Sequence, residues 1–174
     1  PGKNVIEQSI SRRTALTAFI SLSVLGIAIG FYESYKMQLV QLGFIQLLTV
    51  GLLWYYSSVF KRYLLIGNMV ISFLCAVTIM LPLLYEPYRG AINASFVLAF
   101  AVFAFIINMV REIVKDIEDM AGDAARGCKT LPIIAGSTVS KILAIVLSVV
   151  IMMLLYTVQR IQVQTEDYIS FWYF

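Results

Sequence analysis

Five long apolar runs, separated by short charged segments, constrain the fold of this 174-residue chain more than any other feature. The runs cover residues 14–32, 39–56, 63–84, 91–110 and 142–158. A helix needs about 20 apolar residues to cross a bilayer, and each run is close to that length. The helices that they predict lack the polar face of a soluble helix, and only 13% of the residues are charged. The sequence therefore predicts an all-α bundle of transmembrane helices rather than a soluble helical domain.

The Lys and Arg residues predict how these helices are oriented. Ten of the 13 lie in residues 1–13, 57–62 and 111–141, and the opposite connections hold the remaining three. Loops rich in Lys and Arg stay in the cytosol. We therefore expect a protein of the inner or plasma membrane whose lipid bilayer surrounds the helices. Its charged loops, and any active site on them, should face the cytosol.

Small and polar residues inside the runs predict contacts between helices. Gly26 and Gly30 have the four-residue spacing that lets two helices approach closely. Asn68 is polar where an apolar residue would cost less, so it is a candidate for a hydrogen bond between two helices.

Composition excludes several functional classes. The chain has no histidine, which excludes His-based catalysis and His-ligated zinc. Cys75 lies in an apolar run and Cys128 in a charged loop, so they suggest neither a disulfide framework nor a metal cage. The net charge of +3 is not gathered into a basic patch on a soluble fold, and no nucleic-acid partner is expected.

The strongest chemical signal is the charged stretch REIVKDIEDMAGDAARGCKTLP, residues 111–132. On a continuous helix, four of its carboxylates would fall within about 60° of one another. They belong to Glu112, Asp116, Asp119 and Asp123. Glu118 would point elsewhere and be solvated. Oxygen ligands without His or Cys suit a hard cation such as Mg²⁺, which commonly joins carboxylates to substrate phosphates. A loop helix with merely solvated charges is the alternative, and spacing alone does not decide between the two.

Basic and aromatic residues that could accompany such a site lie in two loops. Arg126 and Lys129 directly follow the acidic residues, and Lys61 and Arg62 follow Tyr56 in the loop YYSSVFKR. Cations of this kind balance phosphate charge. Taken alone, the second loop is explained more simply as an aromatic belt with snorkelling cations.

Together these motifs resemble the UbiA superfamily of intramembrane prenyltransferases. KDIEDMAGDAARGCKTLP is similar to the family's second aspartate-rich motif, with its DxxxD core at Asp119 and Asp123 and a GxKTLP tail. YSSVFKR followed by IGN resembles the family's Tyr/Lys loop, and PGKNVIEQSISRRTAL resembles the segment after its first aspartate motif. The similarity covers essentially the whole chain in one register.

The resemblance implies a helical bundle around a cavity that opens to the cytosol and sideways to lipid. It implies transfer of an isoprenoid chain from a prenyl diphosphate donor to a lipid or aromatic acceptor, with Mg²⁺ as cofactor. By carry-over, Asp119 and Asp123 are the metal ligands and, with Asp116, the catalytic residues. The candidate diphosphate contacts are Lys61, Arg126, Lys129 and Tyr56, and for Tyr56 the alternative contact is the first isoprene unit.

Within the family, the acidic second motif looks most like the branch that geranylgeranylates a glycerol-phosphate ether lipid. The branch that prenylates 4-hydroxybenzoate or naphthoate in quinone biosynthesis is the alternative. The sequence identifies neither the acceptor nor the donor chain length.

The chain departs from the family pattern in three ways. Its Tyr-to-Lys spacing is YxxxxK where YxxxK is common, so the role of Tyr56 is less secure than that of Lys61. The first aspartate motif, NDxxDxxxD, is expected upstream of Pro1, and YISFWYF at the other end reads like the start of a sixth span. We therefore expect residues 1–174 to be a single membrane domain, a partial UbiA fold that lacks the N-terminal helices with the first aspartate motif and the C-terminal helices. Half of the metal site would then be missing, and the fragment alone would be inactive.

Two other classes of function stay open. A transporter would need ionisable residues near the middle of the membrane, and the apolar runs contain essentially none. A non-catalytic membrane protein that binds lipid or quinone would keep the fold but lack the first aspartate motif.

Overall fold

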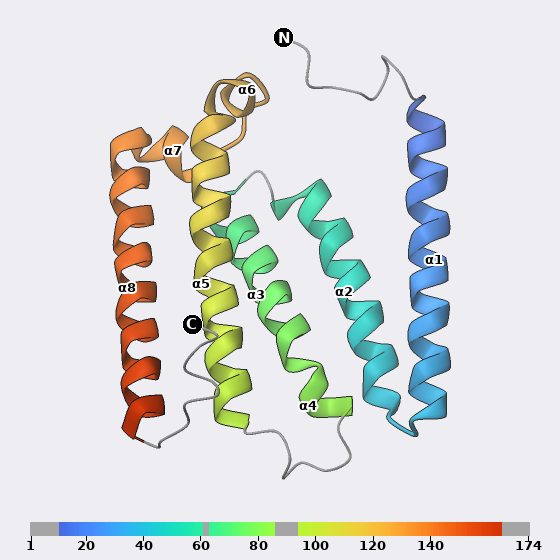
Figure 1. The fold of residues 1–174 in the computed structure, drawn as a ribbon. Coiled ribbons are helices and arrows are strands. Elements are labelled where there is room, and N and C mark those ends of the chain that lie inside the picture. The colour runs from blue at the N-terminus through green and yellow to red at the C-terminus, as the bar shows by residue number, and fades with distance from the viewer. Residues whose placement is uncertain (1–10, 61–62, 86–93, 165–174) are drawn as a thin grey trace. The chain divides into compact units, whose positions relative to one another are not determined.

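The computed structural model describes residues 11–60, 63–85 and 94–164, and within them every regular element is a helix (Figure 1). In chain order the helices are α1 (Arg12–Lys36), α2 (Val40–Ser58), α3 (Ile66–Met80), α4 (Pro82–Tyr85), α5 (Ala94–Glu118), α6 (Met120–Ala125), α7 (Leu131–Ile134) and α8 (Gly136–Gln164). Five candidate spans are long and apolar enough to cross a membrane: α1, α2, α3 with α4, α5 and α8. The predicted all-α membrane bundle is confirmed.

The helix bounds differ from the predicted apolar runs at three places, and the presence or absence of a helix-breaking residue explains each difference. The third run is divided into α3 and α4, because Pro82 has no N–H with which to continue the α3 ladder. The fourth run continues beyond residue 110 to Glu118, because no helix breaker separates its apolar part from its charged part. The fifth begins earlier, at Gly136, whose φ of 86° separates α7 from α8.

Contacts divide the chain into two compact units, residues 1–54 and 55–174. In the first unit, α1 and α2 meet where α1 has glycines. A Cβ atom on Gly30 would lie 2.8 Å from Cγ of Gln46, and one on Gly26 would lie 3.6 Å from Nε2 of the same side chain. The close approach predicted for Gly26 and Gly30 is therefore confirmed, with α2 as the partner helix.

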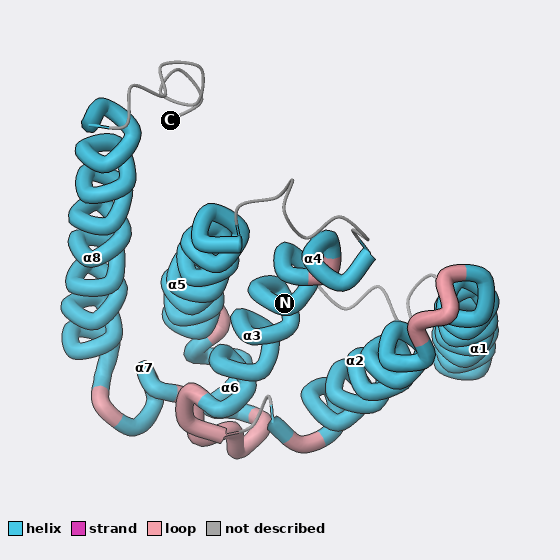
Figure 2. Tube along the Cα trace, turned by 90° about the horizontal axis from the view of Figure 1, so that it is seen from below, coloured by secondary structure: helices cyan, strands magenta, loops and turns pink. Residues whose placement is uncertain are grey.

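In the second unit, α5 lies between α3 and α8 (Figures 1 and 2). Among the described residues, the buried apolar side chains of this unit are Leu74, Ala101, Met109, Ile113, Cys128, Leu131 and Ala144. Large apolar side chains cover the outer surface of α8, where Met152 is 69% exposed. Lipid is as apolar as these side chains, so helices in a membrane can leave them outside. Packing on two sides fixes α5, whose last two turns carry Arg111, Glu112, Lys115 and Asp116.

Candidate active site

The charged end of α5 continues into α6 through a bend at Asp119. α5 ends at Glu118, and Asp119 is the N-cap residue of α6, with a ψ of 1° where a regular helix has about −42°. The amide of Asp123 still donates to the carbonyl of Asp119 at 2.9 Å. The expectation of one continuous helix through all four carboxylates is therefore wrong, because the helix bends between Asp116 and Asp123. Glu118 is exposed, as expected.

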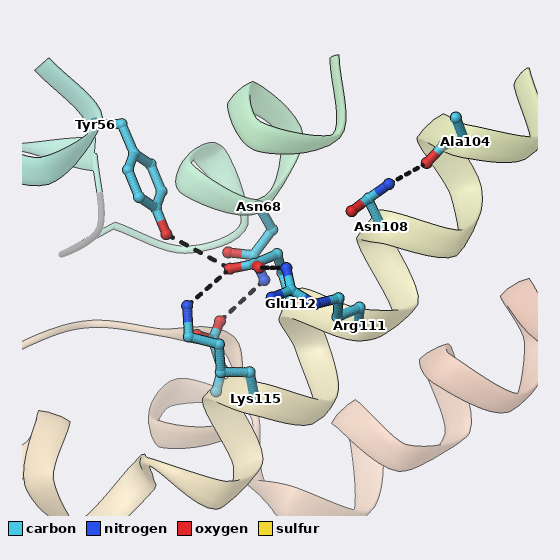
Figure 3. A network of polar contacts seen from close by, with 8 residues as sticks. Tyr56, Asn68, Ala104, Asn108, Arg111, Glu112 and Lys115 are labelled. Carbon is cyan, nitrogen blue, oxygen red and sulfur yellow. Dashed lines mark hydrogen bonds and ion pairs between the residues drawn. The ribbon is translucent and has the colours of Figure 1, made fainter. Parts of the chain in front are cut away.

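Glu112 on α5 is a buried carboxylate surrounded by hydrogen-bond donors (Figure 3). Its side chain is only 4% exposed. Nη1 of Arg111 lies 2.8 Å from Oε1, and Nζ of Lys115 lies 3.3 Å from Oε2. The hydroxyl of Tyr56 donates to the same Oε2 at 3.5 Å. A buried charge costs several kcal/mol unless partners of this kind compensate for lost water, so both oxygens are engaged within the protein.

Asp116 lies one helical turn further along α5 and is joined to α3. Nδ2 of Asn68 donates to Oδ2 of Asp116 at 2.9 Å, and Asn68 is buried. The predicted hydrogen bond of Asn68 between helices is therefore confirmed, and its partner is one of the predicted catalytic carboxylates. Asn108, deeper in α5, instead donates to the carbonyl of Ala104 in its own helix at 2.8 Å (Figure 3).

Tyr56, near the end of α2, is held close to the beginning of α3. A Cβ atom on Gly67 would lie 3.0 Å from Cε2 of Tyr56 and 3.0 Å from the carbonyl oxygen of Phe60. Gly67 therefore leaves room both for the Tyr56 ring and for the backbone that leads to Lys61. From this position the Tyr56 hydroxyl points to Glu112 on α5 (Figure 3).

Asp123 on α6 is the other deeply buried carboxylate, with 2% of the residue exposed. Nη2 of Arg126 lies 3.2 Å from its Oδ1, and Nε of Arg126 donates to the carbonyl of Gly122 at 3.1 Å. A guanidinium has five N–H groups, so these two contacts leave others for a further acceptor. Arg126 therefore balances the charge of Asp123 while its own side chain remains 59% exposed.

The turn after α6 fixes the backbone next to Lys129. Gly127 has a φ of 71° and its amide donates to Ala124, while the amide of Cys128 donates to the carbonyl of Asp123, each at 3.0 Å. This pair of bonds is a Schellman motif, and glycine adopts its positive φ without the clash that a Cβ would cause. Lys129 follows directly and is exposed, so it is available to an anion beside α6.

Asp119 and Asp123 are the predicted metal ligands of this region, and Arg126 pairs with Oδ1 of Asp123. The two aspartates lie four residues apart, and the amide of Asp123 donates to the backbone carbonyl of Asp119. Asp119 is partly exposed, and its side chain makes no capping hydrogen bond. In the described part of the chain, no group of three or more acidic or Cys side chains is close enough to hold a metal alone. This donor set fits Mg²⁺, which needs only one or two carboxylates when phosphate and water complete its shell.

Some of the residues predicted from the sequence are not among those that the structure describes. Lys61, Arg62 and the possible sixth span in residues 165–174 lie outside the described residues. The partners of Glu112 were not foreseen. Its spacing from Lys115, three residues on a helix, is a signal that could have indicated that ion pair. The contact with Tyr56 joins segments far apart in the sequence, and no local pattern indicates it.

Comparison with known families identifies the class of protein. A profile of the UbiA prenyltransferase family matches residues 3–165. The chain belongs to this family. The match extends over α1 to α8, so it contains all of the candidate site residues described above. No solved structure gives a significant match.

The similar UbiA proteins include archaeal enzymes named digeranylgeranylglyceryl phosphate synthase. That of Methanothermobacter thermautotrophicus is 36% identical over 144 residues, which are 83% of this chain and 48% of the relative. Those of Thermococcus sibiricus and Korarchaeum cryptofilum are each 34% identical over 152 residues. These matches cover 86% and 85% of this chain and 50% of each relative. The chain thus spans about half the length of the curated relatives it matches.

Proposed function

We propose that this chain carries half of the active site of a Mg²⁺-dependent prenyltransferase, which transfers an isoprenoid chain from its diphosphate to a glycerol-phosphate ether lipid. The observation that carries the proposal is the aspartate motif of Asp119 and Asp123, with Arg126 paired to Asp123 and Lys129 exposed after the following turn, in a member of the UbiA family. The names of the archaeal relatives support the class of acceptor. The other half of the site, a first aspartate motif, would lie in the part of the relatives that this chain does not span.

The acidic and basic residues would have different roles in binding the donor. Asp119 and Asp123 would hold Mg²⁺, which when bound would offset the negative charge that develops on the departing diphosphate. Arg126 and Lys129 would contact the diphosphate oxygens directly, together with Lys61. Asp116, held by the hydrogen bond from Asn68, would add negative charge beside the two metal ligands without binding Mg²⁺ itself.

The transfer itself exchanges one carbon–oxygen bond for another. The bond between the first prenyl carbon and the diphosphate breaks with its electron pair left on the diphosphate. That carbon bonds to the hydroxyl oxygen of the acceptor, whose proton passes to the released diphosphate or to water. Charge moves onto the diphosphate as this happens, so Arg126 and Lys129 stabilise the transition state more than the bound donor. The apolar helices around the site would keep water from competing with the acceptor.

The bilayer supplies both substrates if the site lies at one membrane surface. The charged end of α5, α6 and the turn to Lys129 all follow the apolar part of α5. The excess of Lys and Arg on these connections supports a cytosolic active site. The prenyl chain would then extend from the charged residues towards the apolar part of the bundle.

The experiment that tests this function is an assay of a chain that contains both aspartate motifs. Purified protein in lipid vesicles would receive radiolabelled geranylgeranyl diphosphate with either geranylgeranylglyceryl phosphate or 4-hydroxybenzoate. We expect label in the ether lipid, dependent on Mg²⁺ and lost on chelation. Transfer to 4-hydroxybenzoate alone would show that the acceptor is an aromatic acid and not the ether lipid. No transfer to either acceptor would overturn the proposal.

A further inference from the structure

We propose that Glu112 is a positioning residue for Tyr56, because it accepts the hydrogen bond of the Tyr56 hydroxyl and so fixes the ring beside the acidic residues. The geometry of this contact comes from the structure alone. Its effect on catalysis rests on the proposed function. Glu112 is neither a predicted metal ligand nor a predicted substrate contact, although it lies two helical turns before Asp119.

The contacts of Glu112 argue against a direct role in binding metal or diphosphate. Both of its oxygens face protein donors: Oε1 faces Arg111, and Oε2 faces Lys115 and Tyr56. Its side chain is almost completely removed from solvent, whereas Arg111 and Lys115 remain 67% and 42% exposed. Charge-assisted hydrogen bonds on both oxygens hold the carboxylate in one orientation. Glu112 is therefore a fixed acceptor inside the protein.

The Tyr56 ring is confined from the opposite direction by α3. Gly67 has no side chain, and any Cβ there would come within 3.0 Å of the ring. The ring thus lies between the backbone of α3 and the carboxylate of Glu112, while its own backbone belongs to α2. Three helices set the position of one side chain. At 3.5 Å the hydroxyl contact is long, so the packing of the ring against Gly67 is also needed to hold it in place.

This arrangement limits what Tyr56 can do for the substrate. A phenol has one proton to donate. When that proton is directed to Glu112, it is not donated to a diphosphate oxygen. The part of Tyr56 that remains for the donor is its ring, so the first isoprene unit is the expected contact. On this view Tyr56→Phe keeps more activity than Tyr56→Ala.

The kinetic test compares two identical changes on the same helix. Glu112→Gln preserves size but removes the charge that holds Arg111 and Lys115, and Glu118→Gln makes the same change at an exposed position. We expect Glu112→Gln to lower kcat about tenfold, with the KM for prenyl diphosphate changed less than about threefold, because a misplaced ring affects the reacting geometry more than binding. Glu118→Gln should match the wild type.

A double mutant separates positioning from a general structural role. In a Tyr56→Ala background, Glu112→Gln should cause no further loss, because the side chain that it positions is gone. An equal tenfold loss in both backgrounds, or no loss in the wild-type background, would overturn the proposal. Equal activities of Tyr56→Phe and Tyr56→Ala would overturn the assignment of the ring as the substrate contact.

A spectroscopic measurement tests the geometry without any turnover. With 3-fluorotyrosine placed at position 56, the fluorine resonance should shift or broaden in Glu112→Gln and in Gly67→Ala, and it should not change in Glu118→Gln. A resonance that responds in a protein without transferase activity would support the positioning and count against the proposed function. A resonance that is the same in all four proteins would overturn the positioning whatever the activity.

Discussion

Replacing Asn68 by alanine is expected to destabilise the contact between α3 and α5 by about 1–2 kcal/mol. A hydrogen bond to a charged group contributes about 1.5–3 kcal/mol in soluble proteins. Polar contacts between membrane helices average about 0.6 kcal/mol and reach about 1.7. The bond from Asn68 to Asp116 is short, at 2.9 Å, and its donor residue is 7% exposed, which favours the upper part of the membrane range. The variant also leaves a partly buried carboxylate without its amide donor.

The same substitution at Asn108 is a matched control. Asn108 donates to the carbonyl of Ala104 within α5, so Asn108→Ala removes the same atoms but no bond between helices. Its expected effect is below about 0.5 kcal/mol, as for a local side-chain bond that competes with the helix itself. Unfolding of both variants in bicelles, followed by steric trapping, measures the difference. Asn68→Asp should be more destabilising than Asn68→Ala, because it places a second carboxylate beside Asp116.

Equal effects of Asn68→Ala and Asn108→Ala would refute this reasoning. That result would mean that the bond between α3 and α5 contributes no more than a bond within one helix. The position of Asp116 would then have to come from apolar packing alone.

Three further substitutions test other parts of the structure. Gly30→Ala should destabilise the protein by about 1–3 kcal/mol in the same unfolding measurement, since its Cβ would meet Gln46 at 2.8 Å. Gly51→Ala, which meets no atom within 4 Å, should be neutral or stabilising. Arg126→Ala should raise the KM for prenyl diphosphate about tenfold or more in the transfer assay, because charge-assisted bonds contribute about 1.5–3 kcal/mol each. An unchanged KM would mean that Arg126 does not contact the donor and only forms its ion pair with Asp123.

The helices could be predicted from sequence because their signal is local. Runs of apolar residues near the thickness of a bilayer give the spans, although Pro82 divides the third run into α3 and α4. The sequence predicted a close helix contact at Gly30, since glycines spaced by four residues mark close approach, but it did not name α2 as the partner. For Asn68 the sequence indicates a partner on another helix, and only the fold shows that this partner is Asp116.

The candidate site was less predictable because it depends on bends and on contacts between distant segments. No proline or glycine at Asp119 marks the bend there, so the sequence gives no local signal for it. Helical spacing therefore extended the acidic stripe past the point where the helix bends. The donors around Glu112 come from α2 and α5, which are separated by a long stretch of sequence. Periodicity alone therefore grouped Glu112 with the other three carboxylates of the acidic stripe, whereas in the fold its contacts are with Arg111, Lys115 and Tyr56.

The measurement that tests the central claim most directly is Mg²⁺-dependent prenyl transfer by Asp119→Ala and by its neighbour variant Glu118→Ala, in a chain with both aspartate motifs. The two carboxylates are adjacent in sequence, but Glu118 is exposed and belongs to α5, whereas Asp119 begins α6 beside Asp123. The account predicts a loss of about 100-fold or more in kcat for Asp119→Ala, as when a stabiliser of transition-state charge is removed, and wild-type activity for Glu118→Ala. Near-normal turnover by Asp119→Ala would contradict the proposed metal site.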